Sequence, residues 1–262
     1  MGNCLMGIVG LLMSVLIATG TTIFNYWTDI VPAAFVVFFF VAAGNSLNDY
    51  MDREVDKVAH PERPIPSGRL APNSARTIAV YCFAAALIAS FFIRIEATLV
   101  VIVAMALMLA YELSTKKKGF SGNLTIGLLT GMLFVFGGAV VGMIDKTIII
   151  ALMAGLATLG REIVKDIEDM DADFDRNTLP KRIGKRNAGL AGSIAFVVAV
   201  ALSPVPYLTS MFGQGYLLVV LVADAIFIYC SIVHFRNPTR GQRFAKYGML
   251  VALVAFLVGG IQ

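Results

Sequence analysis

Long apolar stretches separated by short polar ones run the whole length of the chain. A helix needs about 20 apolar residues to cross a bilayer, and nine stretches of roughly that length recur. They cover residues 4–24, 31–52, 74–93, 96–115, 121–143, 147–167, 187–208, 215–235 and 244–262. No alternation of apolar and polar residues with a period of two recurs, so helices are expected rather than a barrel. The pattern predicts an all-α, polytopic membrane protein with nine transmembrane helices in one domain, residues 1–262.

Composition supports this class. Hydrophobic residues make up 58% of the 262 residues and charged residues 15%, whereas soluble domains have about 45–50% and about 25%. A soluble protein of this size could not bury so much apolar surface. The composition therefore excludes an ordinary soluble globular domain.

Basic residues are confined to alternate connections between the apolar stretches. Of the 21 lysines and arginines, 19 lie in residues 53–76, 116–118, 161–186 and 236–246. The positive-inside rule places these connections in the cytoplasm of a cell-membrane protein, with the N-terminus cytoplasmic and the C-terminus external. The net charge of +4 then reflects topology and contact with anionic membrane lipid. It indicates no nucleic-acid partner, and no obligate protein partner is evident.

Two acid clusters with identical spacing lie at the ends of the second and sixth apolar stretches. They comprise Asp49, Asp52 and Asp56 in the first cluster, and Asp166, Asp169 and Asp173 in the second. Offsets of three and seven residues place three side chains on one helical face. Asn45 and Asn48 share the face of the first cluster. Both clusters lie at the end of the molecule that carries the basic connections.

Stacked carboxylates repel one another, so a cation is expected between them. Oxygen-only ligand sets suit Mg²⁺, which is typically held by one or two carboxylates and substrate phosphates. Mg²⁺ would bridge the acids to a diphosphate and withdraw charge from it as it departs. Basic side chains near the clusters could bind phosphate oxygens directly. The candidates are Arg63, Lys116, Lys117, Arg161, Lys165 and Lys181.

The residues around the clusters resemble the UbiA superfamily of intramembrane prenyltransferases. NDYMDREVD (48–56) and DIEDMDAD (166–173) are similar to its two Asp-rich motifs. HPERPIPSG and YELSTK (111–116) resemble the loop and the Tyr/Lys element between them. The resemblance implies nine helices around a central cavity, with a prenyl diphosphate held under Mg²⁺ and its tail in an apolar tunnel.

The resemblance also implies roles for individual residues. The metal and diphosphate ligands would be Asn48, Asp52, Asp56, Asp169 and Asp173. Asp49 and Asp166 would lie close to the reaction as further catalytic candidates. Phosphate oxygens would be contacted by Arg63, Tyr111 and Lys116, and Asn45 is a further candidate beside them.

Within the superfamily, REIVKDIEDMDAD running into TLPKRIG is most similar to the archaeal ether-lipid branch. That branch transfers a geranylgeranyl group from its diphosphate to geranylgeranylglyceryl phosphate, a phosphorylated lipid acceptor, at a site facing the cytoplasm. One alternative is a related enzyme with an aromatic or haem acceptor, and a more distant one is a cation transporter. Asp224, inside an apolar stretch, is either functional or a protonated or hydrogen-bonded structural residue.

Overall fold

The computed structural model describes residues 2–170 and 177–261, apart from the side chain of Lys117, and all regular structure in them is helical. The long helices are α1 (Gly2–Thr19), α2 (Trp27–Met51), α4 (Pro72–Ser90), α5 (Ile95–Leu113), α6 (Phe120–Val140), α7 (Ile144–Glu168), α9 (Lys185–Leu202), α11 (Gln214–Val233) and α12 (Pro238–Ile261). The short ones are η1 (Gly20–Tyr26), α3 (Arg53–Ala59), η2 (Thr115–Lys117), α8 (Leu179–Ile183) and α10 (Val205–Leu208).

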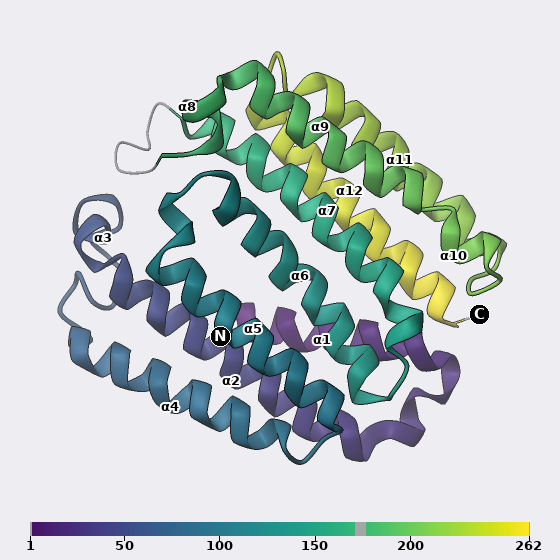
Figure 1. Ribbon diagram of the computed structural model, residues 1–262, viewed down its shortest axis with the longest axis horizontal. Coiled ribbons are helices and arrows are strands. Elements are labelled where there is room, and N and C mark those ends of the chain that lie inside the picture. Colours follow the sequence, from purple (N-terminus) through teal and green to yellow (C-terminus); the bar gives the residue numbers. More distant parts are fainter. Residues whose placement is uncertain (1, 171–176, 262) are drawn as a thin grey trace.

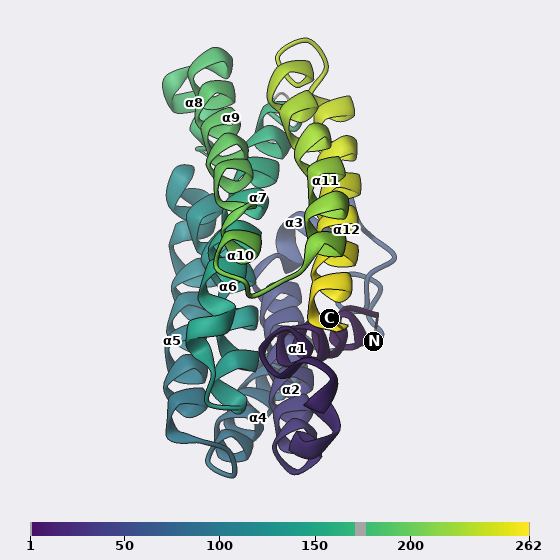
Figure 2. The ribbon, with the colours of Figure 1, turned by 90° about the vertical axis from the view of Figure 1, so that its right-hand side faces the viewer.

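The long helices form a bundle in which neighbours in sequence pack side by side, as α6 with α7 and α11 with α12 (Figures 1 and 2). One buried apolar cluster joins α1, α2, α4, α5 and α6 through residues such as Leu11 and Phe136. A second joins α1, α6, α7, α11 and α12 through Tyr216 and Phe256. Helices α1 and α6 contribute to both clusters, so they connect the two halves of the bundle.

Seven stretches of the described residues are long and apolar enough to cross a membrane. The first, Gly2–Met51, runs through α1, η1 and α2. Helix α4 is not among the seven. Many large apolar side chains on the long helices face outward, such as Phe35, Leu152 and Leu218, as expected for surfaces in contact with lipid tails. The chain is therefore a multi-pass membrane protein.

Close packing of α6 against α7 depends on residues without side chains. A Cβ atom at Gly127 would lie 2.8 Å from the carbonyl oxygen of Gly155, and one at Gly131 would lie 2.7 Å from that of Ala151. Small residues allow helix backbones to approach this closely in membranes. This contact fixes the axial position of α7, which carries the second acid cluster.

Helix ends differ from the sequence-based ranges where proline intervenes. The stretch expected over residues 187–208 matches a candidate membrane span, Lys185–Leu208, but it is not one continuous helix. Helix α9 ends at Leu202, because Pro204 cannot continue its hydrogen-bonding pattern and instead begins the turn into α10. Helix α12 begins at Pro238, several residues before the expected 244. Proline suits the first position of a helix. The first turns of α12 carry basic residues, so an apolar pattern alone does not extend to them.

The connections α3 and α8 lie at one end of the bundle, and α10 and the C-terminus lie at the other (Figure 1). Both acid clusters begin at the α3 and α8 end, where α2 and α7 finish. The basic connections therefore share one end of the molecule with the acid clusters.

Candidate active site

The first acid cluster spans a break between two helices. Helix α2 ends at Met51, and α3 begins at Arg53, with Asp52 between them. The Asp52 N–H still donates to the Asn48 carbonyl at 2.8 Å, and the Asp56 N–H donates to the Asp52 carbonyl at 2.8 Å. The expected single helix is thus interrupted, but the i to i+4 bonds preserve its course through the cluster.

Arg63 neutralises one side of this cluster. Its Nη1 lies 2.7 Å from Asp56 Oδ2 and 3.9 Å from Asp49 Oδ1. Asp56 is only 4% exposed, so its carboxylate requires such a partner. The structure thus places Arg63, a candidate for binding phosphate, against the first acid cluster, and its side chain is 37% exposed.

Lys116 neutralises the other side. Its ammonium lies 2.7 Å from Asp52 Oδ2 and 3.1 Å from Glu112 Oε2. The other oxygen of Glu112 accepts a hydrogen bond from Asn48 Nδ2 at 3.1 Å. The Tyr111 ring centroid lies 5.8 Å from the same ammonium, at the outer limit of a cation–π contact. One lysine therefore links the end of α5 to the first acid cluster.

The second acid cluster extends from the last turn of α7. Asp166 Oδ2 accepts a hydrogen bond from Asn123 Nδ2 of α6 at 2.9 Å. Asp169 follows the last residue of α7, and its N–H donates to the Lys165 carbonyl at 2.9 Å. One turn before Lys165, Arg161 donates a hydrogen bond to the neighbouring Glu162.

A small polar cavity of about 40 Å³ lies beside the second acid cluster. It is lined by Tyr111, Lys116, Gly119, Gly122, Asn123, Ile126, Glu162, Lys165, Asp166, Asp169 and Thr178. Lys116 both lines this cavity and contacts Asp52. The structure therefore brings together most of the expected site residues from α2, α5 and α7.

Two of the remaining candidates, Asn45 and Lys181, do not line this cavity. Asn45 is exposed on α2, one turn before Asp49, and Lys181 is exposed in α8. Asp173 lies outside the described residues, as does the side chain of Lys117. Glu54, in the same acidic segment as Asp52, is fully exposed and turns to Lys57, whose hydrogen bond lowers the pKa of its carboxyl.

Two residues of the site were missed by reasoning from sequence. Glu112 lies within YELSTK, where only its neighbours were considered. An acid near the end of an apolar stretch is a functional candidate by default, and that signal was available. Asn123 carries no comparable signal, because a single asparagine at a helix start is common in any protein.

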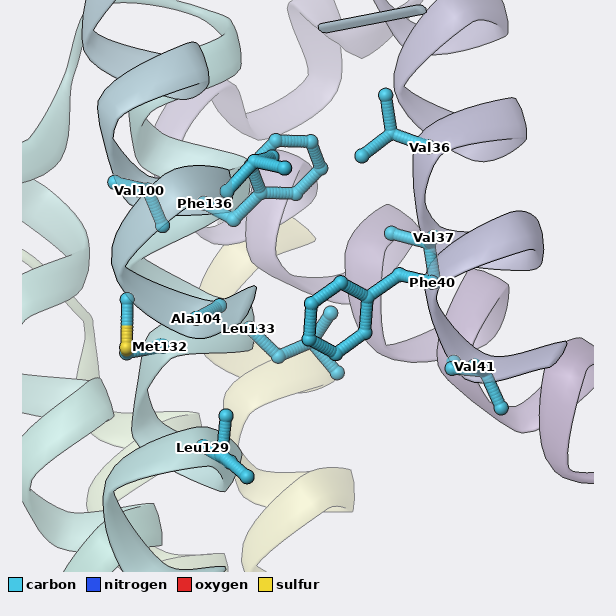
Figure 3. A pocket seen from close by; sticks show the side chains of 12 residues that line it. Val36, Val37, Phe40, Val41, Val100, Ala104, Leu129, Met132, Leu133 and Phe136 are labelled. Carbon is cyan, nitrogen blue, oxygen red and sulfur yellow. The ribbon is translucent and has the colours of Figure 1, made fainter. Parts of the chain in front are cut away.

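Two of the apolar cavities among the described residues share Leu133 as a lining residue. One, of about 140 Å³, is enclosed by side chains of α1, α2, α5 and α6, with Phe40 and Leu133 facing each other (Figure 3). The other, of about 200 Å³, lies among α1, α6, α7, α9, α11 and α12. Asp224 also lines the second cavity and accepts a hydrogen bond from Ser203 at 2.6 Å, which favours the hydrogen-bonded alternative for this acid.

The donor chemistry of the site fits Mg²⁺. Asn48, Asp52 and Asp169 offer the hard oxygen donors that this ion prefers. Within residues 2–170 and 177–261, no group of three or more His, Cys, Asp or Glu side chains is arranged as a metal site. Such a group is unnecessary for an ion that takes one or two carboxylates and completes its shell with phosphate and water.

A match to a known family decides the class of the protein. The UbiA prenyltransferase family matches residues 7–257. The chain belongs to this family. This confirms the resemblance of the chain to the UbiA superfamily, and it identifies a membrane prenyltransferase.

Relatives within the UbiA family cover almost the whole chain. Digeranylgeranylglyceryl phosphate synthase from Methanosphaera stadtmanae is 35% identical, over 99% of this chain and 96% of the relative. The synthase of the same name from Methanothermobacter thermautotrophicus is 37% identical, over 98% and 92%.

Solved structures agree with this relationship. One, described as giving insights into digeranylgeranylglyceryl phosphate synthase in membranes, has a TM-score of 0.88 and 33% identity, covering 99% of this chain and 95% of that one. A UbiA homologue from Archaeoglobus fulgidus bound to GPP and Mg²⁺ has a TM-score of 0.70, covering 99% and 96%. At 14% identity, that second similarity establishes the fold alone.

Proposed function

We propose that this protein transfers a geranylgeranyl group from geranylgeranyl diphosphate to the free hydroxyl of geranylgeranylglyceryl phosphate. The product is digeranylgeranylglyceryl phosphate, with diphosphate released. The observation that carries the proposal is full-length similarity, at 35% and 37% identity, to relatives named for synthesis of this product. The structural neighbour at 33% identity adds to it.

The site supports a diphosphate donor. Asn48, Asp52 and Asp169, together with Asp56 and Asp173, would hold Mg²⁺, which when bound withdraws negative charge from the departing diphosphate. Arg63 and Lys116 now neutralise Asp56 and Asp52. Once those carboxylates face a metal, both cations are positioned to bind phosphate oxygens.

A phosphorylated acceptor brings a second anion, which needs its own positive site. Lys165 lines the polar cavity beside Asp169, and Arg161 lies one turn earlier on α7. Lys181 on α8 adds positive charge at the same end. A neutral acceptor, such as an aromatic ring without a phosphate, would have less use for these cations.

The apolar cavities support two isoprenoid tails. Both proposed substrates carry a C20 chain, and the two cavities lie on either side of Leu133. Gly10 faces Leu133, and a Cβ atom there would lie 2.5 Å from the leucine Cδ2. Leu133, packed closely against Gly10, would then separate the tail in one cavity from the tail in the other.

The distribution of charge supports the topology. We assign all nine long helices as membrane spans, including α1, α2 and α4, and place the α3 and α8 end in the cytoplasm. Apart from Arg94 and Lys146, the lysines and arginines of the described residues lie in the segments that meet at this end, as the positive-inside rule requires of a cytoplasmic face. The N-terminus is then cytoplasmic, the C-terminus external, and the active site opens to the cytoplasm.

An acceptor panel tests the proposal. Purified protein in detergent is given labelled geranylgeranyl diphosphate, Mg²⁺ and one of three acceptors: geranylgeranylglyceryl phosphate, a hydroxybenzoate or haem. Prenylation of the phosphoglycerol lipid, with release of diphosphate, is the expected result. Preferential prenylation of hydroxybenzoate or haem would replace the proposed acceptor. Binding of Mg²⁺ without diphosphate release from any pair would instead favour a cation transporter.

A further inference from the structure

Glu112 is a buried acid in the last turn of α5 that belongs to neither acid cluster. Its side chain is only 2% exposed. Taking a carboxylate out of water is unfavourable unless charges and hydrogen-bond donors compensate. Both of its oxygens are compensated here, one by the Lys116 ammonium at 3.1 Å and the other by the Asn48 amide at 3.1 Å. Each partner is itself a candidate ligand of metal or phosphate.

The Lys116 ammonium is shared between two carboxylates. It lies 2.7 Å from Asp52 and 3.1 Å from Glu112, and its side chain is 7% exposed. A divalent cation bound by Asp52 would repel this ammonium and take over its role there. Glu112 would then be the acid that still holds Lys116, since the two residues are four apart and adjoin in space.

We infer that Glu112 is a positioning residue for the metal and diphosphate site. It retains Lys116 and Asn48 at the site when Asp52 exchanges the lysine for a divalent cation. Without Glu112, the Lys116 ammonium keeps only Asp52 of these two carboxylate partners. It would then compete with the divalent cation for the Asp52 carboxylate. This inference rests on the proposed use of a divalent metal, but not on the identity of the acceptor.

Binding of Mn²⁺, measured by the electron paramagnetic resonance signal of the free ion, tests the role without any substrate. The purified full-length protein in detergent is compared with Glu112→Gln, Lys116→Met and the double variant. Gln keeps the size of Glu and removes its charge. Glu112→Gln should weaken Mn²⁺ binding about tenfold, and in the Lys116→Met background the same change should have less than about a threefold effect.

Matched controls complete the test. Glu54→Gln removes an exposed acid that pairs with Lys57 in the same acidic segment, and it should leave Mn²⁺ binding unchanged. Lys116→Met alone should bind Mn²⁺ at least as tightly as the unaltered protein, because the competing ammonium is gone. This arm remains informative if Glu112→Gln does not fold, which size-exclusion chromatography would reveal.

Three results would overturn the inference. The first is unchanged Mn²⁺ binding by folded Glu112→Gln. The second is an equal loss of Mn²⁺ affinity from Glu112→Gln with and without Lys116→Met, which would make Glu112 a direct ligand of the metal. The third is weaker Mn²⁺ binding by Lys116→Met than by the unaltered protein. Turnover is measured separately with geranylgeranyl diphosphate and the phosphoglycerol lipid. Failure of that reaction in the unaltered protein, with the Mn²⁺ results intact, would remove the proposed acceptor and leave the role of Glu112 standing.

Discussion

Lys165 offers the sharpest test of a phosphorylated acceptor. It is half-buried on α7 and lines the polar cavity together with Asp166 and Asp169. The ion pairs found among the described residues do not include Lys165. We predict that Lys165→Gln weakens the apparent affinity for geranylgeranylglyceryl phosphate and leaves that for the donor nearly unchanged.

The expected magnitude follows from burial. A charge-assisted hydrogen bond to phosphate contributes about 1.5–3 kcal/mol, which corresponds to roughly a tenfold to hundredfold change in affinity. Because Lys165 is only half-buried, solvent screens its charge and the lower end of this range applies. The predicted increase in the apparent KM for the acceptor is therefore about tenfold.

Each substrate is titrated at a saturating level of the other, with labelled geranylgeranyl diphosphate as donor. Lys118→Gln is the matched control, because Lys118 is an exposed lysine at the same end that donates to Ser114 Oγ at 2.7 Å. An unchanged acceptor curve, or a donor curve that shifts equally, would refute the reasoning. Lys165 would then only neutralise its i+4 neighbour Asp169, and the best local argument for a phosphorylated acceptor would be lost.

Four further predictions concern the metal, the tail cavity, the topology and the order of binding. Asp52→Asn should lower turnover about a hundredfold or more, because Lewis-acid stabilisation contributes several kcal/mol, without loss of folding by circular dichroism; near-normal turnover would remove Asp52 as a ligand. Ala104→Phe should narrow the first apolar cavity and raise the KM for geranylgeranyl diphosphate more than that for geranyl diphosphate; equal effects would contradict a tail site there. Cysteines at Asn73 and Asn177, after replacement of the native cysteines, should react in intact cells with membrane-permeant thiol reagents only; labelling by an impermeant reagent would reverse the orientation. Inorganic diphosphate should tighten Mn²⁺ binding measured by paramagnetic resonance; independent binding of the two would argue against exchange of partners between acids and bases.

The sequence was sufficient for the helical class and for the position of the acid clusters. Apolar length alone placed the long helices to within a few residues in most cases, because lipid imposes helical structure on long apolar segments. The expected end at residue 208 coincides with the end of a candidate membrane span. The sequence did not reveal the interruption after Leu202 or the start of α12 at Pro238, where proline rather than hydrophobicity decides the boundary. It also gave no warning of the break at Asp52, where α2 ends and α3 begins although the i to i+4 hydrogen bonds continue.

Pairing within the site could not be predicted in the same way. The acids and bases were recognised as candidates, but the partner of each depends on helices that are distant in sequence. Lys116 meets Asp52 across 64 residues, and Asn123 meets Asp166 across 43. Charge patterning indicates which end of the molecule holds the candidate site, and only the packing of α2, α5, α6 and α7 determines which groups touch.

The ion pairs also explain how the first cluster holds several like charges in a partly buried site. Arg63 compensates Asp56, and Lys116 compensates Asp52, so the repulsion expected from stacked carboxylates is relieved before any ligand arrives. The cations that stabilise the acids are the same ones proposed to bind phosphate. A divalent metal and a diphosphate would therefore satisfy both sets of groups when they bind together, whereas either ligand alone would leave one set with fewer partners of opposite charge. Reciprocal strengthening of metal and diphosphate binding follows from this exchange, and it links the ion pairs of the site to the proposed chemistry.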